Sequence, residues 1–187
     1  MEIIELSNEQ QKLFDYIENS ENNIFVTGRA GTGKSTLLTF FIENTEKRVA
    51  VCAPTGVAAL NVGGQTIHSL FGFPFGLLAN EDLGRHMHRR TREVLKTLDV
   101  LVIDEISMVR ADVVDAMDLF LRENGPQKGK PFGGIQVMFV GDLFQLPPVV
   151  SAADMQVLAD RGYEGPYFFC AMALHRKEVT MVELSKI

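Results

Sequence analysis

The chain has 187 residues, of which 46% are hydrophobic and 22% charged, enough for one globular domain with a substantial core. This composition argues against disorder and collagen-like repeats, and the formal net charge of -6 gives no overall attraction to nucleic acid. No apolar stretch reaches the roughly 20 residues that cross a bilayer, and the start of the chain lacks signal-peptide features, so we expect a cytoplasmic protein without a membrane partner.

Short β-rich runs alternate with helical patterns along the chain, and this alternation predicts a parallel sheet covered by helices. A helix is expected over Ser7–Asn19, because Ser7 and Gln10 have the spacing of a capping box and apolar residues recur on one face. Further helices are predicted over Lys34–Asn44 and Val109–Glu123, the second with a clear apolar stripe.

Four near-continuous apolar runs have the composition of strands that are buried on both faces of a sheet. They cover Asn23–Thr27, Val49–Ala53, Val100–Ile103 and Ile135–Val140. Long loops or small insertions are expected over Phe71–Asn80 and Asn124–Gly134, which are rich in Gly and Pro. Cys52 and Cys170 lie in apolar runs without a metal-ligand or redox spacing, so both are predicted to be buried, reduced thiols.

The stretch GRAGTGKST follows the first predicted strand and opens a predicted helix. It matches the phosphate-binding pattern GxxxxGK[ST] through Gly28, Gly33, Lys34 and Ser35, in the context that the pattern requires. Glycines let backbone N–H groups surround phosphate oxygens, and the helix N-terminus adds positive potential. We therefore expect Lys34 to neutralise the β- and γ-phosphates of a nucleotide and the hydroxyl of Ser35 to bind Mg²⁺.

Two carboxylates follow the buried run in DVLVIDEISM. Asp104 and Glu105 are thereby placed at the carboxyl edge of the sheet, where the sites of α/β proteins lie. Asp104 suits Mg²⁺ coordination, directly or through water, and Glu105 suits the orientation and deprotonation of an attacking water. The pair favours hydrolysis over nucleotide binding alone, although a solvated acidic turn would have the same composition.

A third apolar run, in VMFVGDLFQLPPV, also ends in polar residues, and Gln145 lies just past it. At that edge of the sheet its amide could contact the γ-phosphate or the attacking water and sense whether ATP has been split. A glutamine in a loop is more often only solvated, so this prediction depends on the position of Gln145 beside the other motifs.

Together these motifs resemble the N-terminal ATPase lobe of superfamily-one DNA helicases of the petite integration frequency type, which are relatives of the RecD subunit. The resemblance extends over nearly the whole chain and is carried, in the family's order, by LSNEQQ, GRAGTGKST, APTGVAALNVGGQTIHSLF, DEISM, PFGGIQ and GDLFQLPPV. It implies an α/β fold of the RecA-like P-loop NTPase type, with a parallel β-sheet flanked by helices. It also implies ATP and Mg²⁺ as cofactors and 5′-to-3′ DNA unwinding, with roles in DNA repair, recombination or telomere maintenance.

The same resemblance implies roles for individual residues. Gln10 recognises adenine, Asp104 and Glu105 handle metal and water, and Gln145 senses the γ-phosphate. The phosphates are held by Gly28, Gly31, Thr32, Gly33, Lys34, Ser35 and Thr36. Of these residues Lys34, Glu105 and Gln145 are the predicted catalytic set.

The family uses the stretch APTGVAALNVGGQTIHSLF to contact single-stranded DNA. Its small donors and bare backbone suit close approach to a sugar-phosphate chain. The candidate contacts are Thr55, Gly56, Asn61, Thr66 and His68. Helix capping and turn formation are the competing roles, above all for Thr55 and Asn61. A metal site at His68 is not expected, because no His or Cys stands at a ligand spacing from it.

Two further regions are candidates for DNA contact. The aromatic cluster of Phe71–Phe75 could stack on bases or wedge against a fork, although such a cluster is more often part of a core. The run Arg85–Lys96 concentrates positive charge, including that of Arg85, Arg89 and Arg90, and is either a basic groove or a solvated helix face.

The resemblance implies that residues 1–187 form one N-terminal RecA-like lobe with a small insertion over 72–95. In the family a second ATPase-like lobe follows and supplies arginines to the transition state. An arginine finger contributes about 10³ to 10⁵ in rate, so the chain alone is expected to bind ATP weakly and hydrolyse it poorly. The expected partners are single-stranded, forked or structured DNA, and the protein is expected to be a monomer, associated with the nucleoid if it is bacterial.

Two other classes of function stay open. A stand-alone P-loop ATPase or kinase would keep the phosphate loop but has no use for the QTIHSLF stretch or the FGGIQ signature. A nucleotide-gated binding module without enzymatic activity has no use for a water-activating carboxylate such as Glu105.

Overall fold

The computed structural model describes residues 5–78, 83, 87–176 and 178–185. Within this part of the chain six strands form one sheet in the order β3-β2-β4-β5-β1-β6, and every pairing between neighbours is parallel. In chain order the strands are β1 (Asn23–Thr27), β2 (Val49–Ala53), β3 (Gln65–Thr66), β4 (Val100–Ile103), β5 (Gln136–Val140) and β6 (Val179–Glu183). The predicted parallel sheet is therefore confirmed.

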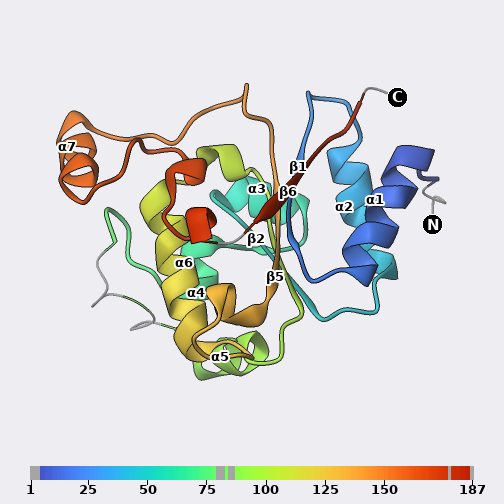
Figure 1. Ribbon diagram of the computed structural model, residues 1–187, viewed down its shortest axis with the longest axis horizontal. Helices are drawn as coiled ribbons and strands as arrows, with labels where there is room; N and C mark the ends of the chain where they lie inside the picture. Colours follow the sequence, from blue (N-terminus) through green and yellow to red (C-terminus); the bar gives the residue numbers. More distant parts are fainter. Residues whose placement is uncertain (1–4, 79–82, 84–86, 177, 186–187) are drawn as a thin grey trace.

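Helices cover both faces of this sheet (Figure 1). They are α1 (Asn8–Asn19), α2 (Lys34–Asn44), α3 (Gly56–Asn61), α4 (Ile67–Phe71), α5 (Arg89–Leu95), α6 (Ala111–Asn124) and α7 (Ala152–Asp160). Short 3₁₀ helices add η2 (Ile106–Met108), η3 (Pro131–Gly134), η4 (Phe168–Cys170) and η5 (Leu174–Arg176).

Two apolar cores lie on opposite faces of the sheet. Side chains of a strand alternate between faces, so Ile24 and Val26 pack in the core beneath α1 and α2, while Phe25 between them packs in the core beneath α4, α5 and α6. Strands β1, β4 and β5 are buried along their whole length, as their continuous apolar runs predict.

The capping box of the first helix is present: the Ser7 hydroxyl accepts the Gln10 N–H at 3.3 Å, and the Gln10 side chain accepts the Ser7 N–H at 2.9 Å. The predicted helix Lys34–Asn44 matches α2, whereas α6 begins two residues later than predicted, at Ala111. Strand β5 begins at Gln136, because Ile135 caps the preceding 3₁₀ turn. Cys52 is buried as expected, but Cys170 is only half-buried, at the end of η4.

Several elements have no counterpart among the sequence predictions. They are β3, β6 and the short helices α3, α4 and α7. Helix α5 lies within the run 85–96, for which a solvated helix face was one of the two alternatives. Strand β6 lies at the sheet edge and is partly exposed, so it lacks the continuous apolar run that marked the central strands. Phe71, placed at the start of a predicted loop, belongs to α4. Part of the proposed insertion, 79–82 and 84–86, lies outside the described residues.

The segment 124–134, which carries the start of the FGGIQ signature, is a structured turn against α6. The N–H of Phe132 donates to Asp118 Oδ1 at 2.6 Å, and Arg122 donates to the other oxygen of that carboxylate at 2.7 Å. Phe132 is fully buried although its φ of 50° is in the left-handed region. A Cβ on Gly133, where φ is +63°, would collide with Leu121 O and lie 2.9 Å from the Gly125 Cα.

At the opposite end of the signature, Gln136 anchors the amino-terminal edge of the sheet. Its Oε1 accepts the Lys47 ammonium at 2.9 Å, and its Nε2 donates to Asn22 O at 2.9 Å. Lys47 also donates to the Ile17 and Ser20 carbonyl oxygens, at 2.6 and 2.9 Å. Burial lowers the pKa of Lys47. These hydrogen bonds of Gln136 and Lys47 therefore hold the start of β5 against the end of α1. They lie at the edge of the sheet opposite the phosphate loop.

A pair of glycine substitutions tests the packing of this turn. Gly129 and Gly133 both have positive φ, but a Cβ at Gly129 meets no atom within 4 Å. Gly129→Ala should therefore carry only the left-handed backbone cost of about 1 kcal/mol. Gly133→Ala adds a collision with backbone and should cost at least about 2 kcal/mol more. Urea unfolding of both variants measures the difference, and equal stabilities would contradict the packing described above.

Candidate functional site

The phosphate loop joins β1 to α2 at the carboxyl edge of the sheet. Gly28, Gly31 and Gly33 have φ values of 149°, 82° and 84°, which side chains rarely adopt. A Cβ on Gly28 would lie 2.6 Å from Thr32 Oγ1 and 2.8 Å from Leu184 O. The loop thus requires glycine for both conformation and space, and it brings backbone N–H groups to the start of α2.

Side chains of the loop divide into those that shape it and those that face outward. Thr32 is buried and donates from its hydroxyl to Arg29 O at 2.9 Å. The Lys34 ammonium donates to Gly28 O at 2.5 Å and Arg29 O at 3.1 Å, so it lies over the loop. Gly31, Ser35 and Thr36 are exposed around it.

The strand order brings the other predicted residues to this loop. Strand β5 pairs with β1 on one side and with β4 on the other. Neighbouring strands are about 4.8 Å apart, so the end of β4 lies about 10 Å from the end of β1. Asp104 follows β4 directly and its N–H donates to Cys52 O at 2.9 Å, which extends the ladder to that residue. Asp104 and Glu105 therefore leave the same edge as Lys34.

The electrostatics of the site link these groups. Burial raises the pKa of Asp104, and the backbone N–H of Glu105 and the Lys34 charge partly offset this rise. The pKa of Glu105 is also raised, first by burial and then by Asp104 and Asp142, while Lys34 opposes the rise. The Lys34 charge thus acts on both carboxylates, so Lys34, Asp104 and Glu105 lie near one another at this edge of the sheet.

Glu105 has an unusual backbone conformation. Its φ of 49° and ψ of 43° are left-handed, although it is not a glycine. Such a conformation costs about 1 to 3 kcal/mol and is found preferentially at functional sites. The strained turn half-buries the carboxylate beside Asp104, instead of letting the chain continue straight out of β4 into solvent.

Asp142 belongs to the site, although sequence reasoning did not identify it. It follows β5, between the phosphate loop and Asp104, and is only 6% exposed. One of its carboxylate oxygens accepts the Phe144 N–H at 2.9 Å, and the other accepts the Gln145 amide at 3.5 Å. The signal available in the sequence was its place two residues past the end of an apolar run, close to the place that marked Asp104.

Gln145 itself is exposed at the end of this turn, where its N–H donates to Asp142 O at 3.0 Å. Gln145 donates to Asp142, and the charge of Asp142 is one cause of the raised pKa of Glu105. Gln145 is thereby placed near Asp104 and Glu105. The predicted γ-phosphate sensor therefore lies at the same edge as the other nucleotide residues.

Gln10 lies behind the phosphate loop with 1% of its surface exposed. Its amide group donates to Gly33 O at 3.0 Å, and its carbonyl oxygen accepts the Ser7 N–H. In this arrangement Gln10 fastens α1 to the phosphate loop at the residue before Lys34. The adenine contact expected of Gln10 stays a prediction.

The candidate DNA residues lie at the same sheet edge, over β2 and β3. Thr55 follows β2 and caps α3, because its hydroxyl accepts the Ala58 N–H at 3.2 Å. Gly56 is exposed at the start of α3 and Asn61 is exposed at its end. The capping role that competes with DNA contact at Thr55 is therefore present, while its hydroxyl proton is still available to a partner.

Thr66 and His68 lie at the start of α4. Thr66 ends β3 and caps α4 by accepting the Ser69 N–H at 3.1 Å. His68 is half-buried, and its pKa is lowered first by burial and then by Arg110, while Asp112 opposes this shift. A lowered pKa keeps His68 neutral near pH 7, so it can donate a hydrogen bond but brings little positive charge.

The two other candidate DNA regions divide between core and surface. Phe71 and Phe73 are 0% and 5% exposed and pack in the core, whereas Phe75 is exposed. In the basic run, Arg89 and Arg90 are exposed on α5, and Arg85 lies outside the described residues.

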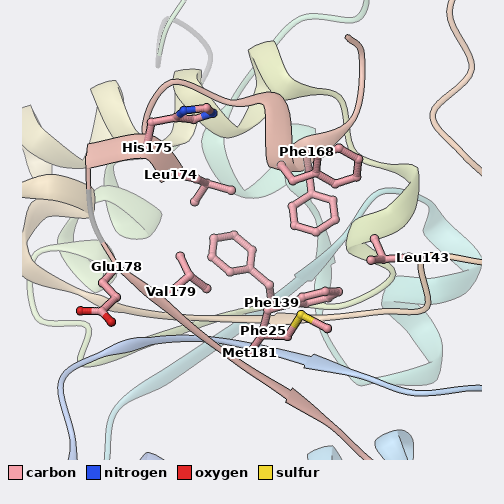
Figure 2. Close-up of a pocket in the computed structure, with 10 residues that line it drawn as sticks. Phe25, Phe139, Leu143, Phe168, Leu174, His175, Glu178, Val179 and Met181 are labelled. Atoms are coloured by element: carbon pink, nitrogen blue, oxygen red, sulfur yellow. The ribbon is translucent and has the colours of Figure 1, made fainter. Parts of the chain in front are cut away.

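A cavity of about 600 Å³ is lined by residues of β1, β5 and β6 (Figure 2). It lies on the face of the sheet opposite α1 and α2. Phe25, Phe139 and Phe168 form much of its wall, and none of the described residues that line it belongs to the phosphate loop. Leu143, which follows Asp142, reaches its rim. The cavity is thus distinct from the phosphate loop.

Within the described residues no group of three or more His, Cys, Asp and Glu side chains is arranged to hold a metal ion. A hydroxyl and one carboxylate, Ser35 and Asp104, agree with the way Mg²⁺ is usually bound beside substrate phosphates, through one or two protein oxygens and water. The helices of the described part also include none long and apolar enough to cross a membrane.

Comparison with known proteins gives a consistent result. A model of the family described as PIF1-like helicase matches residues 5–161. The ATP-dependent DNA helicase PIF1 of Saccharomyces cerevisiae is 45% identical over 152 residues, which cover 77% of this chain and 17% of the yeast protein.

Solved structures of similar proteins extend this result. A structure of two coordinating Pif1 helicases at forked double-stranded DNA has a TM-score of 0.92 and 47% identity, covering 98% of this chain and 44% of that one. The Bacteroides Pif1 helicase in complex with ADP-AlF3 and single-stranded DNA has a TM-score of 0.91 and 46% identity, covering 99% and 43%. These similarities confirm the RecA-like fold. The chain spans less than half the length of each of these relatives.

The strained turn at Glu105 predicts opposite effects on stability and activity. Glu105→Gly relieves the left-handed conformation, whereas Glu105→Ala retains it, so the glycine variant should be more stable than the alanine variant by about 1 kcal/mol. Both variants lose the carboxylate and should lose ATP hydrolysis. Thermal unfolding and phosphate release measure the two effects, and an alanine variant as stable as the glycine variant would show that no strain is stored there.

Proposed function

The chain belongs to the PIF1-like helicase family, and we propose that it supplies the ATP-binding and ATP-hydrolysing lobe of a 5′-to-3′ DNA helicase, and that this lobe also contacts single-stranded DNA. The observation that carries this proposal is the strand order β4-β5-β1, which places Lys34, Asp104 and Glu105 at one sheet edge. The Lys34 charge acts there to lower the pKa of both carboxylates. A RecA-like lobe that only bound nucleotide would have no need for a strained, half-buried glutamate beside its phosphate loop.

Binding of the nucleotide uses the loop and α2. The phosphates of ATP fit against N–H groups of residues 28–36. The turn that presents these groups needs glycine at position 28, because a Cβ there would collide with Thr32 and Leu184. Lys34 can exchange its bonds to the Gly28 and Arg29 carbonyl oxygens for phosphate oxygens of higher charge. When Mg²⁺ is bound by Ser35 and Asp104, it supplies further positive charge to the β- and γ-phosphates.

Hydrolysis depends on Glu105, which orients the attacking water and accepts its proton. The raised pKa of this carboxylate makes it a stronger base than an exposed glutamate. Asp142 accepts a hydrogen bond from the Gln145 amide in the turn that follows β5. A shift of Gln145 when the γ-phosphate leaves would therefore also move this turn. The related Pif1 structure with ADP-AlF3 supports this use of the site.

Single-stranded DNA would lie along the same sheet edge, over α3 and α4. Strand order separates β3 from β1 by four neighbouring-strand spacings, about 19 Å, so a strand at Thr66 lies beside the nucleotide without competing for it. Structures of related Pif1 helicases with single-stranded and forked DNA support this choice of partner. The monomeric state, the cytoplasmic location and the domain boundaries stay predictions.

Variants at Lys34 and Glu105 separate ATP binding from ATP hydrolysis. Lys34→Ala should weaken nucleotide binding and abolish turnover in the intact protein, because the charge acts on both ground and transition states. Glu105→Gln should bind ATP as the wild type does while its turnover falls at least about 100-fold, since it loses a general base. Nucleotide titration and phosphate release measure both, and normal turnover in Glu105→Gln would refute its role.

Thr66 offers a test of the DNA surface that preserves the fold. Aspartate caps a helix at least as well as threonine, so Thr66→Asp should leave stability unchanged while its charge repels a phosphate. We expect weaker binding of single strands and reduced DNA-stimulated ATPase activity, with DNA-free ATPase nearly intact. In the double variant Thr66→Ala/His68→Ala, the plot of log affinity against log salt concentration should become less steep. Each lost phosphate contact should lower the magnitude of its slope by about 0.7.

Affinity should fall similarly for all DNA sequences, because phosphate contacts do not read bases. Unchanged affinity and slope in both variants would leave Thr66 with its capping role alone and move the DNA surface to the exposed Arg89 and Arg90.

A further inference from the structure

Phe75 is 91% exposed, yet its ring is held in a defined position. It stacks on His68 with ring centroids 5.2 Å apart and planes 23° from parallel. The neighbouring rings behave differently, since Phe71 and Phe73 are buried, stack on each other and pack against Phe120. One face of the Phe75 ring is therefore supported by a histidine while the residue remains largely open to solvent.

The backbone on both sides of Phe75 is fastened to the rest of the fold. The N–H of Phe73 donates to His68 O at 3.0 Å. The Arg110 guanidinium donates to Gly76 O at 2.5 Å, and Arg161 donates to Leu78 O at 2.7 Å. Within six residues the chain is thus anchored three times, and Phe75 lies between the anchors.

An ion pair with the buried Asp112 holds Arg110 in turn. Its Nε and its second terminal nitrogen both donate to the Asp112 carboxylate at 2.8 Å, and the Asp112 side chain is only 2% exposed. Asp112 also accepts the Leu78 N–H at 3.2 Å. A bidentate pair of this kind fixes geometry as well as charge. Phe75 is therefore presented by a preorganised segment, so little conformational entropy would be lost when a ligand stacks on it.

The supported ring continues the proposed DNA surface. Thr66 caps α4, His68 lies one residue inside it, and Gly72 ends it in the left-handed conformation that turns the chain toward Phe75. Burial and Arg110 lower the pKa of His68, which favours a neutral ring under Phe75. Stacking on an aromatic side chain suits any base, because every base has a π-face.

We propose that Phe75 is a base-stacking contact for single-stranded DNA, with one base lying on the open part of its ring while the backbone of the strand passes Thr66 and His68. The inference rests on the proposed function, and it adds a contact to the bases at a residue held by the Arg110–Asp112 pair. The ring takes no part in nucleotide binding.

The first test measures the affinity of the intact protein for a fluorescein-labelled oligothymidylate. Phe75→Ala should weaken binding roughly 5-fold to 100-fold, the effect of losing one stacked base. Phe75→Leu should be similarly weak, because it keeps apolar volume but not the flat face, and Phe75→Tyr should bind nearly as the wild type does. The salt slope should stay unchanged in all three, because no phosphate contact is lost.

Phe169→Ala is the matched control. Phe169 is also an exposed ring stacked on a neighbour, Tyr167, with centroids 5.2 Å apart, but it lies on η4 outside the segment from Thr66 to Leu78. Its substitution should leave oligothymidylate affinity unchanged. Thermal unfolding should be unaffected by Phe75→Ala, because the side chain removed is almost wholly exposed.

The second test locates the stacked base by moving one abasic site along the oligonucleotide. In the wild type, one position should weaken binding about as much as Phe75→Ala does. In Phe75→Ala the same abasic site should have no further effect, because both changes remove the same contact. Additive losses at every position, or equal affinity of Phe75→Ala and wild type, would overturn the inference. A wild-type protein that binds no oligothymidylate would instead overturn the proposed function.

Discussion

The order of the parallel strands is the constraint on which the site depends. Strand β5 lies between β1 and β4, and all three are buried on both faces, so their interiors accept only apolar side chains. Polar groups can appear only where each strand ends, and parallel strands end at one edge. The phosphate loop, Asp104 and Asp142 are therefore brought together by residues that have no chemical role of their own.

The opposite edge of the sheet is held by a half-buried cation. Lys47 gathers the carbonyl oxygens that end α1 and the side-chain oxygen of Gln136, and its burial is tolerated because its ammonium has three acceptors. Gln136 belongs to the FGGIQ signature, whose Phe132 and Gly133 pack against α6. The FGGIQ segment thus contributes to the framework, and it fixes where β5 begins and so where Asp142 emerges.

Two left-handed residues show how similar strain can serve different ends. At Phe132 the strain is offset locally, because the ring is fully buried and the N–H donates to the Asp118 carboxylate. At Glu105 no side-chain cap is formed, and the carboxylate is instead held half-buried near Asp104 and Asp142, where its pKa is raised. The first arrangement stabilises a turn. The second keeps the Glu105 carboxylate, the proposed general base, half-buried beside Asp104.

The sequence by itself determined whatever depends on near neighbours: the phosphate loop, the capping box of Ser7 and Gln10, the central strands and the carboxylates that follow β4. Tertiary structure decided the rest. Asp142 is an ordinary turn residue until strand order places it between the phosphate loop and Glu105. Phe73 and Phe75 have the same letter two positions apart, but one packs on Phe120 and the other on His68. A local sequence pattern indicates which roles a residue can take. The burial of its side chain and the residues that it contacts depend on segments far along the chain, which only the folded molecule brings together.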